Sequence, residues 1–557
     1  MFCVIMCSDM GTRKNRLVRA LLAGTLFGCA SAAAAADFAQ LFGTTDRSPL
    51  EYAVGERMTF DIRAQHFTNA LDGACVEWVR AGDDGVCVSG RVAGTAATIR
   101  TSLDRPGFVR VLAWLKDAQG KAWLAFEGGA GADVAKIRQG VPEPDDFDAF
   151  WARQKAALAA IPLAVEREEI KAPTPGVKLY KVKLACAGKM PSTGYLSIPE
   201  AAEKLPATLE FHGYNASWGG RLRRPPRSVP KDRIQMLVSA HGFDLDSKEK
   251  GYYERIQKAA SSNGHTHGFD PEQNKNPETS YFLGMVLRDI RACEYVKTLS
   301  EWNGRDLTVA GYSQGGLQSI WMGALVPGVS NVSAGIPWNC DMGGSEVKRL
   351  RGDWYVKWVP GLGYYDPVNF AKRIPPTCTV QIPHAGLCDY ICPPSGVMAF
   401  WNNLACPRRI RWVQNSTHGT EPPYPNDSWE YRADDFLVAL PAEKGEPKPP
   451  AGDRLAAYVR ANWTLAPHDR MAWNVGTSSA HLAKVAEGLG FDTSLAVTPA
   501  DARRNFAALV TANRDLVPYA QIVYLLEMPR REFAAELRKA GLDASAKPLC
   551  PKLHWHP

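Results

Sequence analysis

Leu307-Thr308-Val309-Ala310-Gly311-Tyr312-Ser313-Gln314-Gly315 is the stretch of sequence that decides the expected fold. Its first four residues form an apolar run typical of a buried strand, and a helical pattern of apolar residues follows the stretch. A strand, a tight turn and a helix in this order lift a serine hydroxyl clear of a sheet, and glycines two positions on either side leave room for the backbone. The stretch therefore predicts that Ser313 is a nucleophile in an α/β fold.

A serine hydroxyl becomes nucleophilic when a histidine takes its proton and a carboxylate orients that histidine. In α/β hydrolases both partners follow the serine, in the order Ser, Asp, His. Asp389 follows the apolar run 379–382, and His418 follows the apolar run 410–413. We therefore predict that Ser313, Asp389 and His418 form a catalytic triad.

Other acids and histidines fit this order less well. Asp341 and Asp366 do not follow so clear a strand, and we interpret them as helix caps or turn residues. His384 precedes Asp389 in the chain, which is the wrong order. The remaining late histidines lie beyond a Pro-rich segment: His468, His481, His554 and His556.

An enzyme of this type also needs two backbone N–H groups that face the charge developing on the substrate oxygen. One is expected from Gln314, directly after the nucleophile. The other is expected from Tyr214, because the apolar run 207–211 leads into His212-Gly213-Tyr214-Asn215 and glycine permits an unusual turn there. The alternative is that the pair His212-Gly213 forms only a turn, with the His212 side chain packed beneath it.

The chain changes character along its length. Residues 37–138 read as short strands broken by turns, which predicts a small immunoglobulin-like β-sandwich. Residues 139–442 alternate helices with short apolar strands, which predicts an α/β-hydrolase core: a mostly parallel sheet with helices on both faces. Residues 443–557 read as a Pro-rich linker followed by helices.

Local signals refine this division. Alternation at Met58, Phe60 and Ile62 indicates a strand, and a polar turn at 117–120 indicates a hairpin between strands at 108–115 and 122–126. Near the C-terminus, Thr498 is expected to cap a helix that begins at Pro499, and Gly541 is expected to end the last helix, which starts near Pro529. A long polar insertion, 217–278, is expected to cover a site or to be solvated.

Residues 1–36 are predicted to be a signal peptide. Four basic residues, Arg13, Lys14, Arg16 and Arg19, precede the apolar run 20–27, and small residues follow as far as Ala36. The run is too short to span a bilayer, so cleavage near Ala36 and a periplasmic or secreted protein are expected. Lipid attachment at Cys29 is the less favoured alternative.

Composition and charge exclude several classes of protein. The chain has 557 residues, of which 45% are hydrophobic and 22% charged, so two or three compact units are expected. The leader carries four basic residues and Asp9, so its removal lowers the net charge from +7 to +4. Such a small, scattered positive charge argues against nucleic acid as a partner, and no later segment is long and apolar enough for a membrane span.

Ten of the thirteen cysteines lie after the leader, in a chain whose expected compartment permits disulfides. We predict a bond between Cys75 and Cys87, which are close in sequence, and note that Cys388 and Cys392 flank Asp389. No spacing matches a zinc site, and His265-Thr266-His267 alone is more typical of a loop. Neither a metal nor a cofactor is predicted.

Four segments together resemble the acetylxylan esterase and cephalosporin-C deacetylase family of carbohydrate esterases, over roughly residues 142–422. The first resembles the opening helix of the family, the second its oxyanion loop, the third its Ser-Gln-Gly-Gly elbow and the fourth the stretch after its catalytic Asp. They are Asp146-Phe147-Asp148-Ala149-Phe150-Trp151, His212-Gly213-Tyr214-Asn215, Gly311-Tyr312-Ser313-Gln314-Gly315-Gly316 and Asp389-Tyr390-Ile391-Cys392-Pro393-Pro394.

The resemblance implies a hydrolase that removes acetyl groups from carbohydrates such as xylan or oligosaccharides, without metal or cofactor, and often assembles as a homo-oligomer. Two departures are visible. Ser239-Ala240-His241-Gly242 stands where classical members carry Arg-Gly-Gln, and Gly419 stands where they carry Glu after the catalytic His. Tryptophans 218, 338 and 354 are candidates for stacking on sugar rings, although tryptophans are more often core residues.

Two other functions remain open. A serine peptidase of the prolyl-oligopeptidase kind shares the fold and the order of the triad, but it would normally bring a propeller of several hundred residues. A carbohydrate-binding protein that kept the fold without catalysis would be expected to lose Ser313, Asp389 or His418, and all three are present.

Overall fold

The structure is a computed structural model, and it describes residues 39–557 apart from a set of positions given at the end of this paragraph. The predicted signal peptide, the lipidation alternative at Cys29 and the candidate sugar-stacking Trp218 lie outside the described residues. The positions not described after residue 39 are 47, 66, 68, 70, 201–203, 215–221, 353, 420–427, 433–442, 446, 449–450, 476, 478, 527, 529, 544–546, 551–552 and 554–557.

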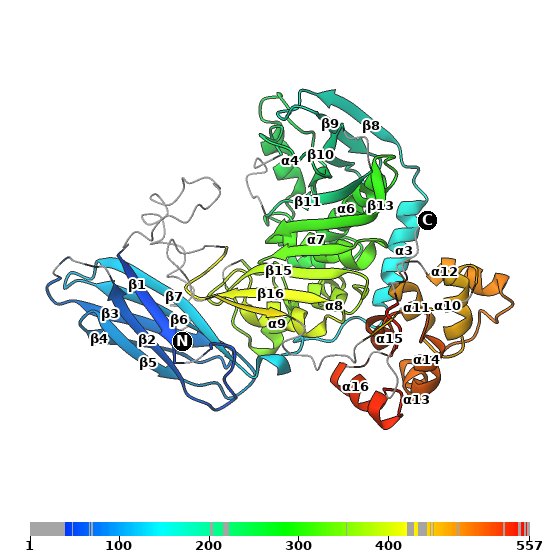
Figure 1. Ribbon diagram of the computed structural model, residues 1–557. Coiled ribbons are helices and arrows are strands. Elements are labelled where there is room, and N and C mark those ends of the chain that lie inside the picture. Colours follow the sequence, from blue (N-terminus) through cyan, green and yellow to red (C-terminus); the bar gives the residue numbers. More distant parts are fainter. Residues whose placement is uncertain are drawn as a thin grey trace.

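Two antiparallel sheets form a β-sandwich at the N-terminal end (Figure 1). One sheet has the order β1-β2-β5 and the other the order β4-β3-β6-β7. Met58, Phe60 and Ile62 on β2 are almost fully buried in the shared core, as their alternation predicts. The strands are β1 (Gln40–Thr45), β2 (Met58–Gln65), β3 (Cys75–Gly82), β4 (Cys87–Ala93), β5 (Ala96–Thr101), β6 (Gly107–Lys116) and β7 (Ala122–Ala132).

The predicted hairpin between β6 and β7 is confirmed. Asp117 accepts hydrogen bonds from the backbone N–H groups of Gln119 and Lys121, at 3.1 and 2.9 Å, and so closes the turn. Gly120 has a φ of 78°, a left-handed conformation that favours glycine.

The predicted disulfide between Cys75 and Cys87 is wrong. On the antiparallel pair β3 and β4, Cys75 lies opposite Ala93, whereas Cys87 lies opposite Ala81. Six residues of extended strand therefore separate the two positions, which is about 20 Å. A disulfide requires Cα atoms within about 7 Å, so proximity in sequence was misleading in a long hairpin.

A ten-stranded sheet follows, with the order β17-β16-β15-β14-β13-β11-β12-β10-β9-β8. Its six strands from β16 to β12 run parallel, and the strands at both ends run antiparallel to their neighbours. The strands are β8 (Val165–Ile170), β9 (Val177–Leu184), β10 (Ser192–Pro199), β11 (Leu205–Phe211), β12 (Ile234–Ser239), β13 (Trp302–Tyr312), β14 (Asn331–Gly335), β15 (Thr379–Gly386), β16 (Arg408–Val413) and β17 (Ser428–Arg432).

Helices cover this sheet and bury most of its apolar side chains in one core (Figure 1). The predicted strands at 207–211, 307–310, 379–382 and 410–413 all belong to the parallel part, which confirms the α/β-hydrolase class. The helices are α3 (Phe147–Ala159), α4 (Tyr252–Ala260), α5 (Pro271–Asn274), α6 (Tyr281–Lys297), α7 (Gln314–Leu325), α8 (Pro367–Ala371) and α9 (Pro394–Asn403).

The C-terminal segment forms a helical unit with its own core. As predicted, Thr498 caps the helix that begins at Pro499, and Gly541, with a φ of 68°, follows the last helix. The helices are α10 (Arg454–Asn462), α11 (His468–Asn474), α12 (Ser479–Gly488), α13 (Pro499–Arg504), α14 (Phe506–Ala512), α15 (Tyr519–Leu525) and α16 (Arg530–Lys539).

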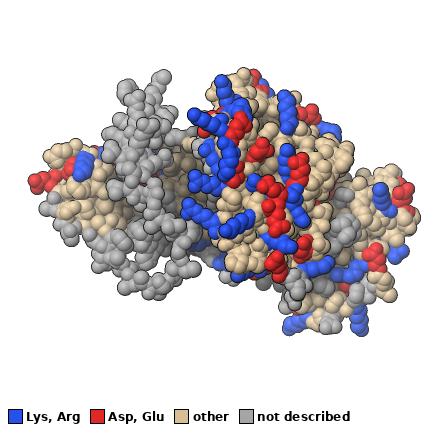
Figure 2. All heavy atoms as spheres, turned by 90° about the horizontal axis from the view of Figure 1, so that it is seen from above, with Lys and Arg blue, Asp and Glu red and all other residues tan. Residues whose placement is uncertain are grey.

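We call the ten-stranded sheet with helices α3 to α9 the sheet domain. The β-sandwich and the C-terminal helices lie on opposite sides of it (Figure 1). Basic and acidic side chains are interspersed over most of the face seen in Figure 2. Among the described residues, no helix has the length and apolarity needed to cross a bilayer.

Candidate active site

Ser313 sits in a strained turn between strand β13 and helix α7. Its φ is 57°, a left-handed conformation that non-glycine residues adopt rarely, and its N–H donates to the carbonyl of Gly335, 3.0 Å away. The next residue, Gln314, begins α7, so the positive end of the helix dipole lies beside the serine.

The surrounding glycines are required by close packing. A Cβ on Gly311 would lie 2.5 Å from the carbonyl carbon of Gly315, and one on Gly315 would lie 2.3 Å from the carbonyl oxygen of Phe211. No side chain fits at either distance, so the Gly-x-Ser-x-Gly spacing reflects the meeting of the elbow with the end of strand β11.

Ser313, His418 and Asp389 come together in one hydrogen-bonded chain, although Ser313 and His418 are 105 residues apart. His418 Nε2 lies 3.1 Å from Ser313 Oγ, and His418 Nδ1 lies 3.1 Å from Asp389 Oδ2. Asp389 is 2% exposed, whereas the His418 side chain is 23% exposed, so the chain runs from a buried carboxylate to the surface. A serine, a histidine and a carboxylate bonded in this order can move a proton away from the serine hydroxyl.

The Asp389 carboxylate is held by its own loop. Its Oδ1 accepts hydrogen bonds from the N–H groups of Ile391 and Cys392, both at 2.8 Å, which leaves Oδ2 directed at the histidine. The loops of Asp389 and His418 also bond to each other, because the N–H of Cys388 donates to the carbonyl of Ser416 at 3.1 Å. The geometry of the hydrogen-bonded chain therefore depends on the placement of both loops.

Asp389, Cys392 and His418 also form the described cluster whose spacing would suit a metal ion, with potential ligand atoms within 4.8 Å of one another. Two of these residues already take part in the chain to Ser313. Burial raises the pKa of the Cys392 thiol well above its ordinary value, and it does the same for Cys388. The side chains of Cys388 and Cys392 are therefore protonated, weakly reactive thiols at neutral pH.

The other acids weighed in the sequence have structural roles. Asp366 caps helix α8 by accepting a 3.0 Å bond from the N–H of Val368, and Asp341 begins a 3₁₀ turn and pairs with Arg349. Within the described part of the chain, the acid that bonds to His418 is Asp389, and both Asp341 and Asp366 fit the interpretation as cap or turn residues.

The loop expected to carry the second oxyanion donor lies against the elbow. A Cβ on Gly213 would be 4.0 Å from Ser313 Cβ and 3.5 Å from the carbonyl oxygen of Tyr312. Gly213 thus lies directly beside Ser313, the candidate nucleophile. His212 does pack beneath this loop, and its Nδ1 donates to the Gly213 carbonyl at 2.8 Å.

Three imidazoles lie together beside Gly213, and one of them, His241, belongs to the segment that stands where the family resemblance would place Arg-Gly-Gln. The rings of His212 and His241 lie 5.0 Å apart, and those of His241 and His267 lie 4.7 Å apart. Burial lowers the pKa of all three, that of His267 to about 3. An arginine reaches the same place from helix α6, where Arg288 Nε donates to the carbonyl of Ala240 at 2.6 Å.

An aromatic cluster borders the nucleophile. The Tyr214 ring stacks on His267 at 4.4 Å and lies edge-on to Trp338 and Trp354, at 5.6 and 5.0 Å. Trp338 is 1% exposed and belongs to the core, whereas Trp354 is 40% exposed. Of the described tryptophans proposed for sugar stacking, Trp354 is therefore the accessible one. Because His267 lies in the insertion 217–278, part of this insertion borders the site.

A buried acid supports the elbow from behind. Asp289 on α6 accepts a 2.9 Å hydrogen bond from Gln318 Nε2, and Gln318 Oε1 accepts a 3.3 Å bond from the side chain of Gln314. Asp289 Oδ1 has no hydrogen-bond partner within the described part of the chain. Burial raises the pKa of Asp289 to about 8. Sequence reasoning missed this residue, because its helical position alone is typical of a solvated acid.

This raised pKa makes stability depend on pH. The folded chain holds a proton on Asp289 that the unfolded chain loses above its ordinary pKa of 3.8, so the favourable contribution is complete below that value and lost as pH rises toward 8. Asp289→Asn keeps the acceptor for Gln318 and cannot ionise. We expect its melting temperature to exceed that of the wild type by about 2–5 °C at pH 8.

Calorimetry or circular dichroism melts at several pH values test this expectation. Asp72→Asn, at an exposed position of the sandwich, is the control, and its melting temperature should equal that of the wild type at every pH. A gain for Asp289→Asn that is the same at pH 4 and pH 8 would contradict the buried-acid interpretation, since only ionisation distinguishes the two conditions.

Comparison with known proteins agrees with this architecture. The family model described as acetyl xylan esterase matches residues 132–348 and 354–434, which together make up more than half of the chain. The acetyl esterase Axe7A of Xylanibacter ruminicola (strain ATCC 19189 / DSM 19721 / CIP 105475 / JCM 8958 / 23) is 28% identical over 299 residues. That match covers 50% of this chain and 66% of the relative, so the chain spans just under two thirds of the relative's length.

Two solved structures are similar at lower identity. The acetyl xylan esterase from Paenibacillus sp. R4 is 22% identical with a TM-score of 0.43, and the match covers 52% of this chain and 94% of that one. Acetyl xylan esterase 1 from Thermoanaerobacterium sp. JW/SL YS485 is 22% identical with a TM-score of 0.42, covering 52% and 93%.

Proposed function

Because the chain belongs to the acetyl xylan esterase family, we propose that it is a serine esterase that removes acetyl groups from a carbohydrate. The observation that carries the proposal is the hydrogen-bonded chain from Ser313 through His418 to Asp389, within 3.1 Å at each step. Ser313 stands at a strained strand-to-helix turn, the position from which a serine hydroxyl reaches a substrate.

The proposed mechanism has two halves. Ser313 Oγ attacks the acetyl carbonyl carbon while His418 Nε2 accepts its proton, and His418 then gives that proton to the departing sugar oxygen. In the second half His418 takes a proton from water while the water oxygen attacks the acetyl-serine, and it then returns that proton to Ser313 Oγ as the bond between Oγ and the acetyl carbon breaks. The product leaves as acetic acid, which ionises to acetate in water. Asp389 keeps the imidazole oriented and stabilises its cationic form in both halves.

The backbone N–H groups of Gln314 and Tyr214 are proposed to hold the oxyanion. Gln314 stands at the first position of α7, where N–H groups lack helical partners, and Gly213, directly before Tyr214, lies beside Ser313.

The experiment is acetate release by the purified protein from acetylated xylo-oligosaccharides and from a simple aryl acetate. The Ser313→Ala chain serves as the blank for spontaneous hydrolysis. Release from both substrates, faster per site from the oligosaccharide, supports a carbohydrate esterase. Faster release from the aryl ester alone would reduce the proposal to a general esterase.

Failure to release acetate from either substrate would contradict the proposal. Two alternatives would then be measured directly: cleavage of short peptides by a peptidase of the prolyl-oligopeptidase kind, and binding of oligosaccharides without turnover. Trp354 fluorescence on addition of a sugar distinguishes the binding alternative, since this side chain is exposed beside the nucleophile.

Export to the periplasm or medium is part of the proposal. Its support is the basic, then apolar, then small-residue pattern of the first 36 residues. Mass spectrometry of the mature N-terminus tests it, and a chain that still carries residues 1–36 after export would contradict cleavage near Ala36. Assembly as a homo-oligomer stays a prediction, for which the measurement is the molar mass in solution.

A further inference from the structure

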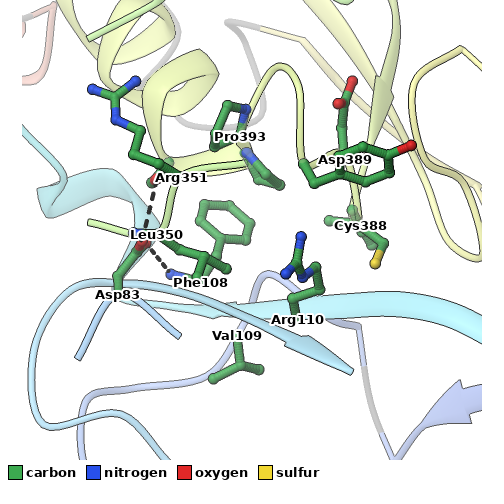
Figure 3. Close-up of a pocket in the computed structure, with 13 residues that line it drawn as sticks. Asp83, Phe108, Val109, Arg110, Leu350, Arg351, Cys388, Asp389 and Pro393 are labelled. Atoms are coloured by element: carbon green, nitrogen blue, oxygen red, sulfur yellow. Dashed lines mark hydrogen bonds between the residues drawn. The ribbon is translucent and has the colours of Figure 1, made fainter. Parts of the chain in front are cut away.

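The N-terminal β-sandwich contacts the sheet domain at the two loops that carry Asp389 and His418. Figure 3 shows strand β6 of the sandwich beneath the loop of Asp389, with a pocket between them. Arg110 rises from β6 into this pocket toward Cys388. We propose that the sandwich is a positioning element for the catalytic histidine and aspartate, in addition to any role as an accessory module.

The contact with the histidine loop consists of specific hydrogen bonds. Gln414 Nε2 donates to the carbonyl of Gly129 at 3.0 Å, and Gln414 Oε1 accepts from the N–H of the same glycine at 2.9 Å. Gln414 is 2% exposed, so both bonds are shielded from water. The side chain of Gln414 thus binds the edge of β7 as a neighbouring strand would.

The next residue strengthens this link. Asn415 has a φ of 49°, a left-handed conformation, and its Oδ1 accepts a 2.9 Å hydrogen bond from the N–H of Glu127 on β7. Asn415 is three residues before His418. Because the sandwich holds the residue where the backbone bends, it also restricts the direction in which the histidine loop leaves β16.

The aspartate loop is packed against the same glycine. A Cβ on Gly129 would lie 2.3 Å from the carbonyl oxygen of Leu387, and Leu387 is two residues before Asp389. The two backbones therefore lie too close for any side chain at position 129, and a larger residue there would displace the loop.

Two further contacts join the β-sandwich to the sheet domain. The ring of Phe108 on β6 packs against Trp412 on β16, with centroids 5.6 Å apart. Asp83 of the sandwich is 2% exposed, and its carboxylate accepts 2.8 Å bonds from the N–H groups of Phe108 and Leu350, so it joins the sandwich to the sheet domain. A surface so specifically bonded is unlike that of a freely tethered module.

The contacts of Leu387, Gln414 and Asn415 lie on loops, directly after strands β15 and β16 end, and this position decides their consequence. Loops at the end of a sheet are set by whatever packs on them, and a displacement of about 1 Å in a catalytic group can reduce the rate about 100-fold. The proposal rests on the proposed esterase activity where its test measures a rate. Its second readout is hydrogen–deuterium exchange in the two loops, which does not require that activity.

The test uses the full-length protein with two variants at the contact. Gly129→Ala pushes on the Leu387 carbonyl, and Gln414→Met keeps the side-chain shape while losing both hydrogen bonds. We expect kcat to fall about 10- to 100-fold for the first and about 10-fold for the second, with KM within about threefold of the wild type. Hydrogen–deuterium exchange should rise in the segments 387–392 and 414–418.

Gly90→Ala is the matched control. Gly90 lies on β4, at the opposite edge of the sheet β4-β3-β6-β7 from β7, and its added Cβ would lie 2.5 Å from the Trp78 ring, so it causes a clash away from both loops. It should keep kcat near the wild-type value and leave exchange in those two segments unchanged. Equal losses of kcat in Gly90→Ala and Gly129→Ala, or unchanged exchange in both segments for Gly129→Ala and Gln414→Met, would overturn the positioning role.

The failure of this inference is distinguishable from failure of the proposed function. A wild-type protein that releases no acetate contradicts the esterase proposal, and the exchange measurement still decides whether the sandwich orders the two loops. A wild-type protein that is active, with variants that keep its kcat and its exchange pattern, contradicts the positioning role alone.

Discussion

Ser313→Ala is expected to lower kcat for acetate release by about 10⁴- to 10⁶-fold and to leave KM nearly unchanged. The hydroxyl is the group that would attack the ester, and its oxygen lies 3.1 Å from His418 Nε2, the atom that would accept its proton. The methyl group that replaces it fits the same turn, because the left-handed φ of 57° depends on the surrounding backbone. Initial-rate measurements over a range of substrate concentrations give both constants.

Ser319→Ala is the matched control for this substitution. Ser319 lies on the same helix, fully buried, and its hydroxyl donates to the carbonyl of Gly315 at 2.8 Å. Its loss should change kcat by less than about threefold, because it touches no group of the chain from Ser313 to Asp389. Retention of substantial activity by Ser313→Ala, with a normal melt, would contradict the nucleophile assignment.

Asp389→Asn is expected to lower kcat by about 10³- to 10⁴-fold while the protein stays folded. The amide can keep the bonds from the Ile391 and Cys392 N–H groups through its oxygen, but its NH₂ group then faces His418 Nδ1. This contact favours the wrong tautomer of the imidazole, whose Nε2 would no longer accept the serine proton. The measurement is kcat together with the melting temperature.

Asp366→Asn tests the competing acid and should show the opposite pattern. Asp366 accepts hydrogen bonds from the N–H groups of Asp341, Met342 and Val368, and burial raises its pKa to about 7. An amide NH₂ group facing one of these donors costs about 1–3 kcal/mol. We expect a lower melting temperature with kcat within about threefold. Loss of kcat in Asp366→Asn and not in Asp389→Asn would exchange the two roles.

Much of the fold was predictable from sequence because its signals are local. The period of Met58, Phe60 and Ile62 requires a strand with one buried face, and all three are buried. Thr498 before Pro499 predicts a helix start, and the observed cap has both bonds of a capping box. Such patterns depend on neighbours within a few residues, so distant contacts seldom overrule them.

The candidate site was predictable for the same reason, as far as chain order goes. The elbow at Ser313 and the runs before Asp389 and His418 place the three residues at the ends of parallel strands, and the structure brings them into one hydrogen-bonded chain. Their roles in catalysis stay predictions until the variants are measured.

Properties that depend on distant segments were not predictable. Cys75 and Cys87 are near in sequence but far apart along a hairpin, and only the strand register separates them. The burial of Asp289, with its raised pKa, depends on the elbow packed against α6.

By itself, the sequence determined the order of strands and helices, the strained serine turn and the identity of the candidate nucleophile, acid and base. Those features follow from side-chain periodicity, from glycine's freedom and from chain order. Only the tertiary structure decided that Gly129 and Gln414 join the sandwich to the loops of His418 and Asp389. Backbone contacts between residues almost three hundred positions apart leave no pattern in a single chain, since any glycine or glutamine looks the same before folding places it.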